Sequence, residues 1–277
     1  MYGILTSDPD FVRKEIDDFV HYVADDVTGR RRTPLDGAVN SVACWGDNGT
    51  VHADPSRAAV TAEGIRATPE AEGHHWETVC PTDADYRAAL LNRTEAVGAV
   101  GDVRLTTLGF PGADFCRCDR CERQFTTSDH DDRVAWRTET ISRFVSDVSN
   151  RVGGDLIVTL YPDPYPGNLR DRSGVDPQAL APYVDGFLVP LCSISYETTY
   201  WVESLARGFA AELAEIGLPL TVQLSAAQAG VDRLVDVTRQ VEPHTDAVVY
   251  GAGEDDLETV RAVIERRRRA TSPLPTA

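Results

Sequence analysis

Short apolar runs rich in β-branched residues alternate with longer amphipathic segments along most of the chain. The apolar runs predict strands at 2–7, 37–45, 102–110, 155–162, 184–192, 219–226 and 246–252. The amphipathic segments predict helices at 9–27, 82–98, 132–152, 198–216, 230–242 and 254–268. The helical pattern is clearest in 132–152, where one face carries Ile141, Phe144, Val145, Val148 and Val152. This alternation is typical of repeated βα units around a parallel sheet.

The number of βα units decides between two α/β folds. Seven strands are readable, and an eighth is expected in the irregular polar stretch 49–79, with "GTVHAD" (49–54) as its best candidate. Eight units in 277 residues is the size of a TIM (β/α)8 barrel, whose functional loops follow the carboxyl ends of the strands. A doubly wound open sheet is the alternative, but no Gly-rich phosphate-binding turn follows a predicted strand. We expect one barrel domain over 1–269 and a flexible tail over 270–277.

The charge balance of the chain is strongly acidic. It has 44 Asp and Glu against 27 Lys and Arg, a formal net charge of −17, and Lys14 is its single lysine. Such a composition is typical of proteins that stay soluble in concentrated salt, so we expect a halophilic, haloarchaeal source. The lack of a basic stripe argues against nucleic acid as a partner. No apolar run is long enough for a membrane span or a signal peptide, so we expect a cytoplasmic protein without a membrane partner.

Four of the six cysteines fall on two predicted βα loops. Cys116, Cys118 and Cys121 form a CxCxxC run after the strand 102–110, and Cys80 precedes the helix 82–98. Loops that follow adjacent parallel strands emerge side by side, so we expect the four thiols to meet. Four thiolates suit a closed, tetrahedral, structural zinc site. Ordinary buried cysteines and an iron–sulfur cluster are the alternatives. A histidine could also replace one thiol, and the candidates are His74, His75 and His130.

The surroundings of these cysteines resemble a known enzyme family. "CPTDADYR" (80–87), followed by the CxCxxC run, looks like the zinc loop of the family forty-two β-galactosidases, which are TIM barrels. "VRLTTLGFPGADFCRCDRC" (103–121) and "VDGFLVPLCSISYETTYW" (184–201) are similar to a wider group of glycosidase-like barrels. The resemblance covers residues 80 to 205. It implies a carbohydrate-directed barrel in which the four cysteines hold zinc.

The chain departs from that family where the family places its catalytic residues. Glycoside hydrolysis needs two carboxyl groups flanking the scissile bond. In the β-galactosidases these are glutamates at the ends of the strand before the CxCxxC run and of the seventh strand. The corresponding positions here are Thr106, Thr107, Gln223 and Gln228. The family's catalytic pair is therefore not carried over to this chain.

Other carboxylates follow predicted strands, where barrel enzymes keep their chemistry. They are Asp8, Asp47, Asp163, Glu197 and Glu254. Asp163, in a loop stiffened by two prolines, and Glu197 are the predicted catalytic residues. The predicted substrate-binding residues, chosen because aromatic faces stack on sugar rings and carboxylates accept from sugar hydroxyls, are Trp45, Asp47, Tyr161, Tyr165, Tyr196 and Trp201. "EGHHWETVC" (72–80) is best interpreted as a surface or zinc-neighbouring loop.

These features together predict a glycoside hydrolase-like barrel. Its partner is a small-molecule or oligosaccharide substrate, and zinc is its structural cofactor. A non-catalytic carbohydrate-binding barrel is the first alternative, and it predicts aromatic residues in the cleft without a carboxylate pair. A zinc-dependent hydrolase is the second, and it requires an open position on the metal.

Overall fold

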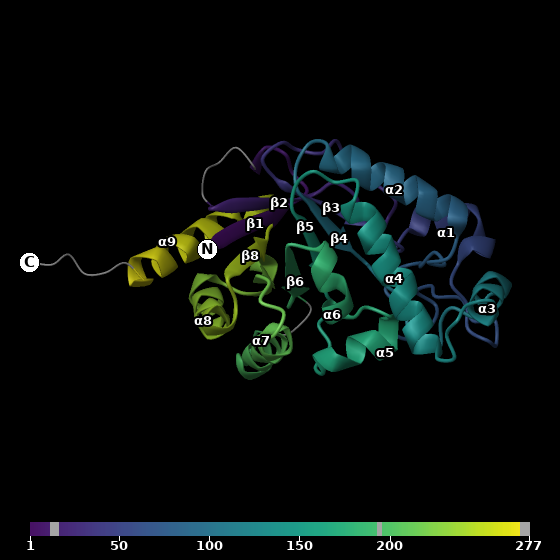
Figure 1. Ribbon diagram of the computed structural model, residues 1–277. Helices are drawn as coiled ribbons and strands as arrows, with labels where there is room; N and C mark the ends of the chain where they lie inside the picture. The colour runs from purple at the N-terminus through teal and green to yellow at the C-terminus, as the bar shows by residue number, and fades with distance from the viewer. Residues whose placement is uncertain (12–16, 193–195, 272–277) are drawn as a thin grey trace, which may run out of the picture.

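Eight parallel strands form a closed barrel, so the chain is a TIM (β/α)8 barrel, as the alternation of strands and helices predicts. The computed structural model describes residues 1–11, 17–192 and 196–271, without the side chains of Gln228, Glu254 and Thr271. The strands are β1 (Tyr2–Thr6), β2 (Phe19–Val23), β3 (Val39–Ala43), β4 (Val103–Thr106), β5 (Leu156–Thr159), β6 (Gly186–Pro190), β7 (Leu220–Ser225) and β8 (Ala247–Gly251). Each strand pairs with the next, and β8 pairs with β1 to close the barrel (Figure 1).

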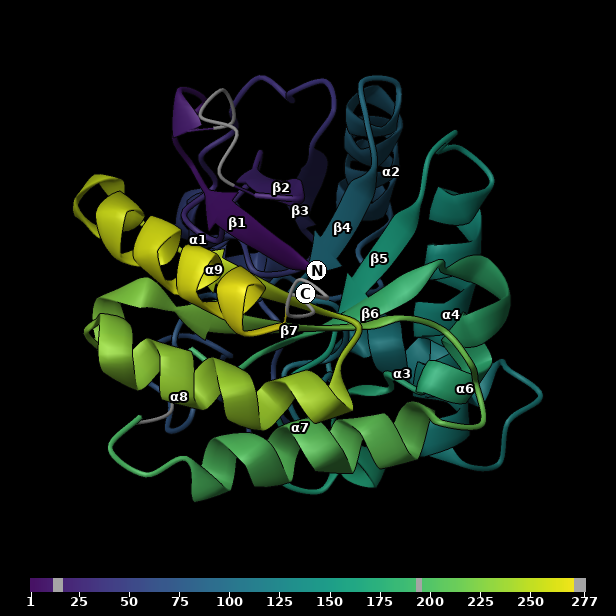
Figure 2. The same ribbon diagram turned by 90° about the vertical axis from the view of Figure 1, so that its left-hand side faces the viewer.

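Helices cover the outside of the barrel unevenly. They are α1 (Asn48–Ala53), α2 (Ala84–Gly98), α3 (Asp119–Thr126), α4 (Arg133–Ser149), α5 (Leu169–Ser173), α6 (Pro177–Leu180), α7 (Tyr200–Leu213), α8 (Val231–Val241) and α9 (Leu257–Thr271). Short 3-10 turns occupy Pro55–Arg57, Pro166–Asn168, Ala181–Tyr183, Ala226–Gln228, Glu242–His244 and Glu254–Asp256. Figure 2 shows α7, α8 and α9 on one flank of the barrel and α2 and α4 on another. The described chain has no helix between β2 and β3, and none of its helices is both long and apolar enough to cross a membrane.

The strand missing from the predicted set lies near the N-terminus. The helix predicted over 9–27 is wrong for residues 19–23, which form β2, while residues 12–16 of that prediction lie outside the described residues. Phe19 lies against Gly3 of β1, where an added Cβ would stand 2.5 Å from the Phe19 ring. Pairing of β2 with β1 and β3 thus overrides the local helical pattern. The expected strand "GTVHAD" is wrong as well, because its first five residues belong to α1.

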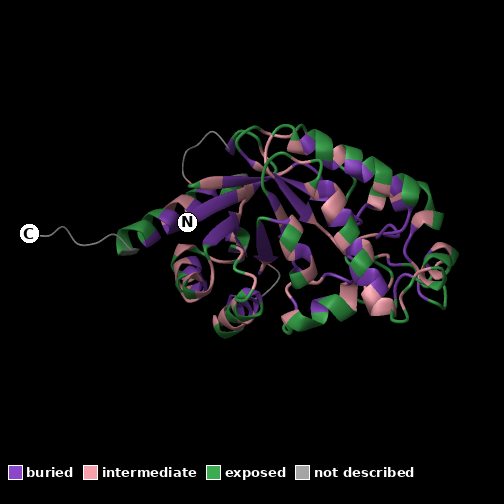
Figure 3. Cartoon of the chain, viewed as in Figure 1, coloured by how far each residue is buried: buried purple, intermediate pink, exposed green. Residues whose placement is uncertain are grey.

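The hydrophobic core fills the barrel and the layer between strands and helices (Figure 3). The stripe predicted on α4 is confirmed, because four of its five residues are buried and Val152 packs against them beyond the helix end. Complete burial of a large apolar side chain contributes about 1.5–3 kcal/mol. The barrel core is therefore a stable base for the loops at the carboxyl ends of the strands.

Two of these loops fold together beyond β3 and β4. The connection from β3 to α2 spans residues 44–83 and folds back on itself through the bridges Gly46↔Thr78, Ala58↔Val79 and Val60↔Arg66. The loop after β4 joins it where the backbone N–H of Arg117 donates to Val60 O at 2.7 Å. Adjacent parallel strands thus bring residues from distant parts of the sequence together.

Candidate functional site

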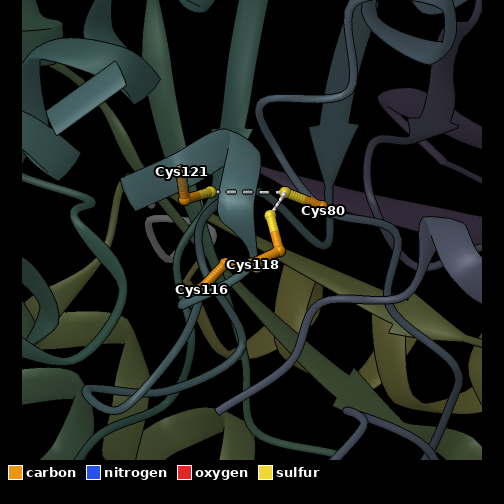
Figure 4. Close-up of side chains that lie close together, drawn as sticks. All are labelled: Cys80, Cys116, Cys118 and Cys121. Atoms are coloured by element: carbon orange, nitrogen blue, oxygen red, sulfur yellow. Dashed lines mark hydrogen bonds between the residues drawn. The ribbon is translucent and has the colours of Figure 1, made fainter. Parts of the chain in front are cut away.

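Four cysteine side chains converge where these two loops meet. The Sγ atoms of Cys80, Cys116, Cys118 and Cys121 all lie within 4.8 Å of one another, and none of the four forms a disulfide. Cys80 Sγ lies 3.6 Å from Cys118 Sγ and 3.4 Å from Cys121 Sγ (Figure 4). Four sulfur atoms around one point match the donor set of a tetrahedral metal site. The predicted meeting of the four thiols is therefore confirmed, and the cluster is compatible with a bound metal.

Hydrogen-bond donors surround the sulfur atoms. The backbone N–H of Val60 donates to Cys116 Sγ at 3.4 Å, and Thr82 Oγ1 lies 3.1 Å from Cys121 Sγ. Hydrogen bonds from the neighbouring thiols, Cys116 first, lower the pKa of Cys118. Burial alone would lower the pKa of Arg120. The neighbouring Cys80, Asp83 and Cys118 outweigh burial and raise it. These hydrogen-bond donors favour the thiolate form of Cys118, and the thiolate is the form of cysteine that binds metals.

The histidines considered as ligands stand outside this cluster. Among the described residues, the group with metal-binding geometry consists of the four cysteines alone. His130 pairs with Glu139 instead. His74 packs edge-on against Phe115, next to Cys116, with ring centroids 5.2 Å apart. The segment 72–80 is therefore a neighbour of the cysteine cluster, as expected for a zinc-neighbouring loop.

A cavity of about 460 Å³ opens at the carboxyl ends of β4 to β7. Thr106, Thr159 and Gln223 line it from the strands, and the segment 73–76 closes one side. Its volume lies in the usual range for a small-molecule site. The described residues that line this cavity include no Asp and no Glu.

Arg104 is the most unusual residue of the cavity wall. It stands in the middle of β4, is 4% exposed, and lines the cavity. Its Nε and Nη1 atoms have no hydrogen-bond partner among the described residues, and neither does the hydroxyl of Thr159 on the adjacent strand. Burial lowers the pKa of Arg104 to about 10, so the guanidinium stays charged at neutral pH. A buried, charged and unpartnered group of this kind is rare in structural cores.

A second arginine lines the cavity beside an aromatic ring. The guanidinium of Arg172 lies over the ring of Tyr161, with its carbon 4.1 Å from the ring centroid, and its Nη1 lies 3.3 Å from Asp163 Oδ2. Burial, followed by the charges of Arg172 and His75, lowers the pKa of His74. This wall thus combines a partly neutralised cation with the aromatic side chains of Tyr161 and Trp76.

Strain marks the end of β4 next to this wall. Thr107 has a φ of 48°, which is unfavourable for a β-branched residue. Its Oγ1 accepts a hydrogen bond from the backbone N–H of Gly46 at 3.1 Å. This bond holds the loops after β3 and β4 together where they border the cavity.

The predicted carboxylates are engaged elsewhere in the structure. Asp163 is buried, accepts from the backbone N–H of Tyr165 at 2.8 Å, and pairs with Arg172. Asp47 caps α1 by accepting from Thr50 and also accepts from the hydroxyl of Tyr86 at 3.2 Å. Both carboxylates thus stabilise their own loops, and neither lines the cavity.

The two remaining carboxylates whose side chains are described, Glu197 and Asp8, do not line the cavity. Glu197 is exposed, and its backbone carbonyl accepts from Arg233. Asp8 accepts from the backbone N–H of Asp10 in its own turn. The side chain of Glu254 lies outside the described residues.

The predicted aromatic residues separate into two groups. Trp45 and Tyr196 are buried: Trp45 packs against Phe144, and the Tyr196 hydroxyl donates to Leu191 O at 2.9 Å. Tyr161, Tyr165 and Trp201 are exposed, and Tyr161 lines the cavity. Only the exposed group presents ring faces to solvent.

Sequence reasoning did not identify the arginines and Trp76 of the cavity. One signal was available for Arg104, because a charged residue in the middle of an apolar strand of a parallel barrel is unusual. Its position two residues before Thr106 also places both on the same face of β4. Arg172 lies in the short helix α5 and Trp76 in an irregular segment, and neither position has such a pattern.

No protein-family model matches the chain, and no curated protein is similar to it in sequence. Among solved structures, an engineered protein is 12% identical, over 96% of this chain and 68% of that chain, with a TM-score of 0.54. A bee venom hyaluronidase in complex with a hyaluronic acid tetramer is 11% identical, over 98% and 96% of the two chains, with a TM-score of 0.47. A fungal β-1,4-galactanase is 10% identical, over 90% and 88%, with a TM-score of 0.42. The engineered protein has the same fold as this chain.

Proposed function

We propose that this protein is a carbohydrate-binding TIM barrel that holds a sugar in the cavity at the carboxyl ends of β4 to β7. One observation carries the proposal: the cavity combines ring faces and uncharged polar groups with no carboxylate among its described lining residues. Trp76 and Tyr161 offer the ring faces, and Thr106, Thr159 and Gln223 offer hydroxyl and amide groups. Such a lining can stack on a pyranose ring and hydrogen-bond its hydroxyls.

The lining favours binding over hydrolysis. A glycosidase needs an acid and a second carboxylate on opposite sides of the scissile bond. Thr106, Thr107 and Gln223 stand at or next to the positions of the two catalytic glutamates in the β-galactosidases that the sequence resembles. All three residues line the cavity. Asp163 is held by Arg172 and a backbone N–H. The non-catalytic alternative raised by the sequence is therefore the one that we propose.

Exposed aromatic side chains that follow β5 and β6 support a ligand larger than one sugar unit. Tyr165, Tyr200 and Trp201 are between 57% and 72% exposed, although large aromatic side chains are usually covered. Tyr165 follows β5, whereas Tyr200 and Trp201 follow β6 and pack edge-on against each other. Exposed rings beyond the carboxyl ends of adjacent strands suit contacts with additional sugar units of an oligosaccharide.

Zinc is the metal that we propose for the four-cysteine cluster. Four thiolates favour a soft or borderline divalent ion in tetrahedral geometry. With four protein ligands no coordination position remains for water, so the metal has a structural role and the zinc-dependent hydrolase is not favoured. The metal would hold the β3–α2 connection against the loop after β4. The β3–α2 connection carries His74 and Trp76 to the cavity.

The binding proposal is tested by calorimetry of oligosaccharides with the wild type and the variants Tyr161→Ala and Trp76→Ala. Each variant is expected to weaken binding by about tenfold. Tyr183→Ala is the matched control, because Tyr183 precedes β6 and lies at the other end of the barrel. Turnover of a glycoside that is lost in both Asp163→Asn and Glu197→Gln would show an enzyme and contradict the proposal.

The zinc proposal is tested by metal analysis of purified protein. The wild type and Cys192→Ser are expected to contain one zinc per chain, because Cys192 lies outside the cluster. Cys80→Ser is expected to lose zinc and to unfold at a lower temperature. Full zinc content in Cys80→Ser would contradict the four-thiolate assignment.

A further inference from the structure

Arg104 is a buried cation for which the described residues provide no anion. The residues with which its charge interacts are His21 on β2 and Cys192 after β6. Burial, followed by the charge of Arg104, lowers the pKa of His21 well below its usual value, so His21 is neutral. Burial raises the pKa of Cys192 to about 11, so this thiol is also uncharged at neutral pH. No described group in contact with the cavity therefore neutralises Arg104.

Two residues of this wall have polar atoms without a hydrogen-bond partner among the described residues. Arg104 Nε and Nη1 and the hydroxyl of Thr159 have no hydrogen-bond partner among the described residues, and both residues line the cavity from adjacent strands. A buried donor without an acceptor is strongly unfavourable, and more so for a charged donor. The cavity is therefore built to be completed by a group with acceptor atoms and negative charge.

The rest of the described lining carries one further cation and no carboxylate. Arg172 stands on the cavity wall beside His74 and His75, and burial lowers the pKa of His74. The lack of a carboxylate in the described lining is notable in a chain with 44 acidic and 27 basic residues, where an average surface patch would carry acids. Arg172 already pairs with Asp163, which leaves Arg104 as the cation in need of a partner.

We propose that the cavity binds a sugar that carries an acidic oxygen group, a carboxylate or a phosphate, and that Arg104 is the residue that pairs with this group. The inference rests on the proposed carbohydrate-binding function and adds the substrate class. A guanidinium presents two parallel N–H donors, which match the paired oxygens of a carboxylate or a phosphate. Trp76 and Tyr161 then face the sugar ring, and Thr159 donates to an oxygen of the ligand.

The proposal is tested by calorimetry with matched ligands at pH 7.5 and a fixed KCl concentration. The ligands are glucose, glucuronate, glucose 6-phosphate and inorganic phosphate, together with galactose, galacturonate and galactose 6-phosphate. At least one acidic sugar is expected to bind roughly tenfold to a hundredfold more tightly than its neutral counterpart, as expected for a charge-assisted pair in a buried site. Preference for the uronate or for the phosphate tells the two acidic groups apart.

Two variants assign the effect to Arg104. Arg104→Met is expected to abolish the preference for the acidic sugar, while Arg104→Lys retains part of it because the charge stays but the paired donors are lost. Arg143→Met is the matched control, because Arg143 lies exposed on α4 and away from the cavity. Circular dichroism checks that each variant is folded.

The outcomes separate this inference from the proposed function. Equal affinity for neutral and acidic sugars overturns the inference and leaves the carbohydrate-binding function standing. Inorganic phosphate binding as tightly as a sugar phosphate supports the anion site and contradicts a sugar ligand. An acidic preference that survives in Arg104→Met overturns the role of Arg104, and no binding of any ligand overturns both proposals.

Discussion

Arg137 in α4 and Arg104 in β4 are both almost completely buried, at 1% and 4% exposed, but their surroundings differ. Arg137 donates to the backbone carbonyls of Gly112 and Ala113, each at 2.9 Å, and to those of Asp171 and Arg172. Arg104 makes no comparable set of bonds, and two of its three nitrogen atoms lack any described partner. Burial lowers the pKa of each to about 10.

The difference between the two arginines separates a structural role from a binding role. Arg137 fixes the loop after β4 to α5, and through the backbone of Arg172 it positions one cationic side chain of the cavity wall. Arg104 fixes nothing among the described residues, so the free energy lost by burying its charge is not recovered within the chain. An unrecovered cost of this kind is typical of binding sites.

The largest expected effect is that of Arg137→Met. The substitution keeps an apolar side chain of similar length but leaves up to four buried carbonyl oxygens without their donor. The free energy of unfolding should fall by about 3–5 kcal/mol, because several buried carbonyl acceptors lose their hydrogen bonds at once. Urea unfolding followed by circular dichroism measures it, with Arg143→Met as an exposed control that changes stability by less than about 0.5 kcal/mol. A change no larger than in the control would contradict the structural role of Arg137.

Arg104→Met should change stability in the opposite direction. Without ligand, the variant replaces an unpaired buried charge by an apolar side chain of similar volume, and the free energy of unfolding should rise by about 1–4 kcal/mol. The same urea experiment detects this gain. A loss of stability as large as that of Arg137→Met would show that the two arginines have the same role and would remove the basis of the comparison.

The sequence predicts the region around the cysteines much better than the region around Arg104. Cys80 and the CxCxxC run lie in loops after adjacent strands, and short spacing together with barrel topology is enough to bring their thiols together. The strands and the long helices from residue 82 onward are also readable, because their apolar patterns are regular, whereas the short helices α3, α5 and α6 were not predicted. These predictions depend on local periodicity and on one topological rule.

The cavity could not be predicted in the same way, because its residues come from four strands, from α5 and from the segments that follow β3, β4, β5 and β6. Whether Asp163 or Asp47 faces a ligand depends on single hydrogen bonds to Tyr165 and Thr50, which the sequence pattern does not encode. The strand β2 was missed for a related reason, since pairing with β1 and β3 decides its conformation. Tertiary contacts rather than local propensity fix these parts of the molecule.

The smallest of the expected effects is a dependence of stability on pH that arises from His21. His21 is 1% exposed, and burial, followed by the charge of Arg104, depresses its pKa in the folded state. Above pH 6.5 both states have a neutral imidazole, so His21 contributes no pH dependence there. Below that pH the unfolded chain binds a proton that the folded protein does not, and the free energy of unfolding falls by about 1.4 kcal/mol per pH unit down to the folded-state pKa.

The pH effect also reports on Arg104, which makes it the finest test of the comparison between the two arginines. His21→Phe should remove this part of the slope between pH 6.5 and 5, as measured by urea unfolding at each pH. In Arg104→Met the repulsive charge is absent and only desolvation remains, so the folded-state pKa of His21 rises and the slope ends at a higher pH. Arg137→Met should leave it unchanged, because Arg137 does not contribute to the pKa of His21. Identical profiles for the wild type and His21→Phe would contradict the buried, neutral state of His21.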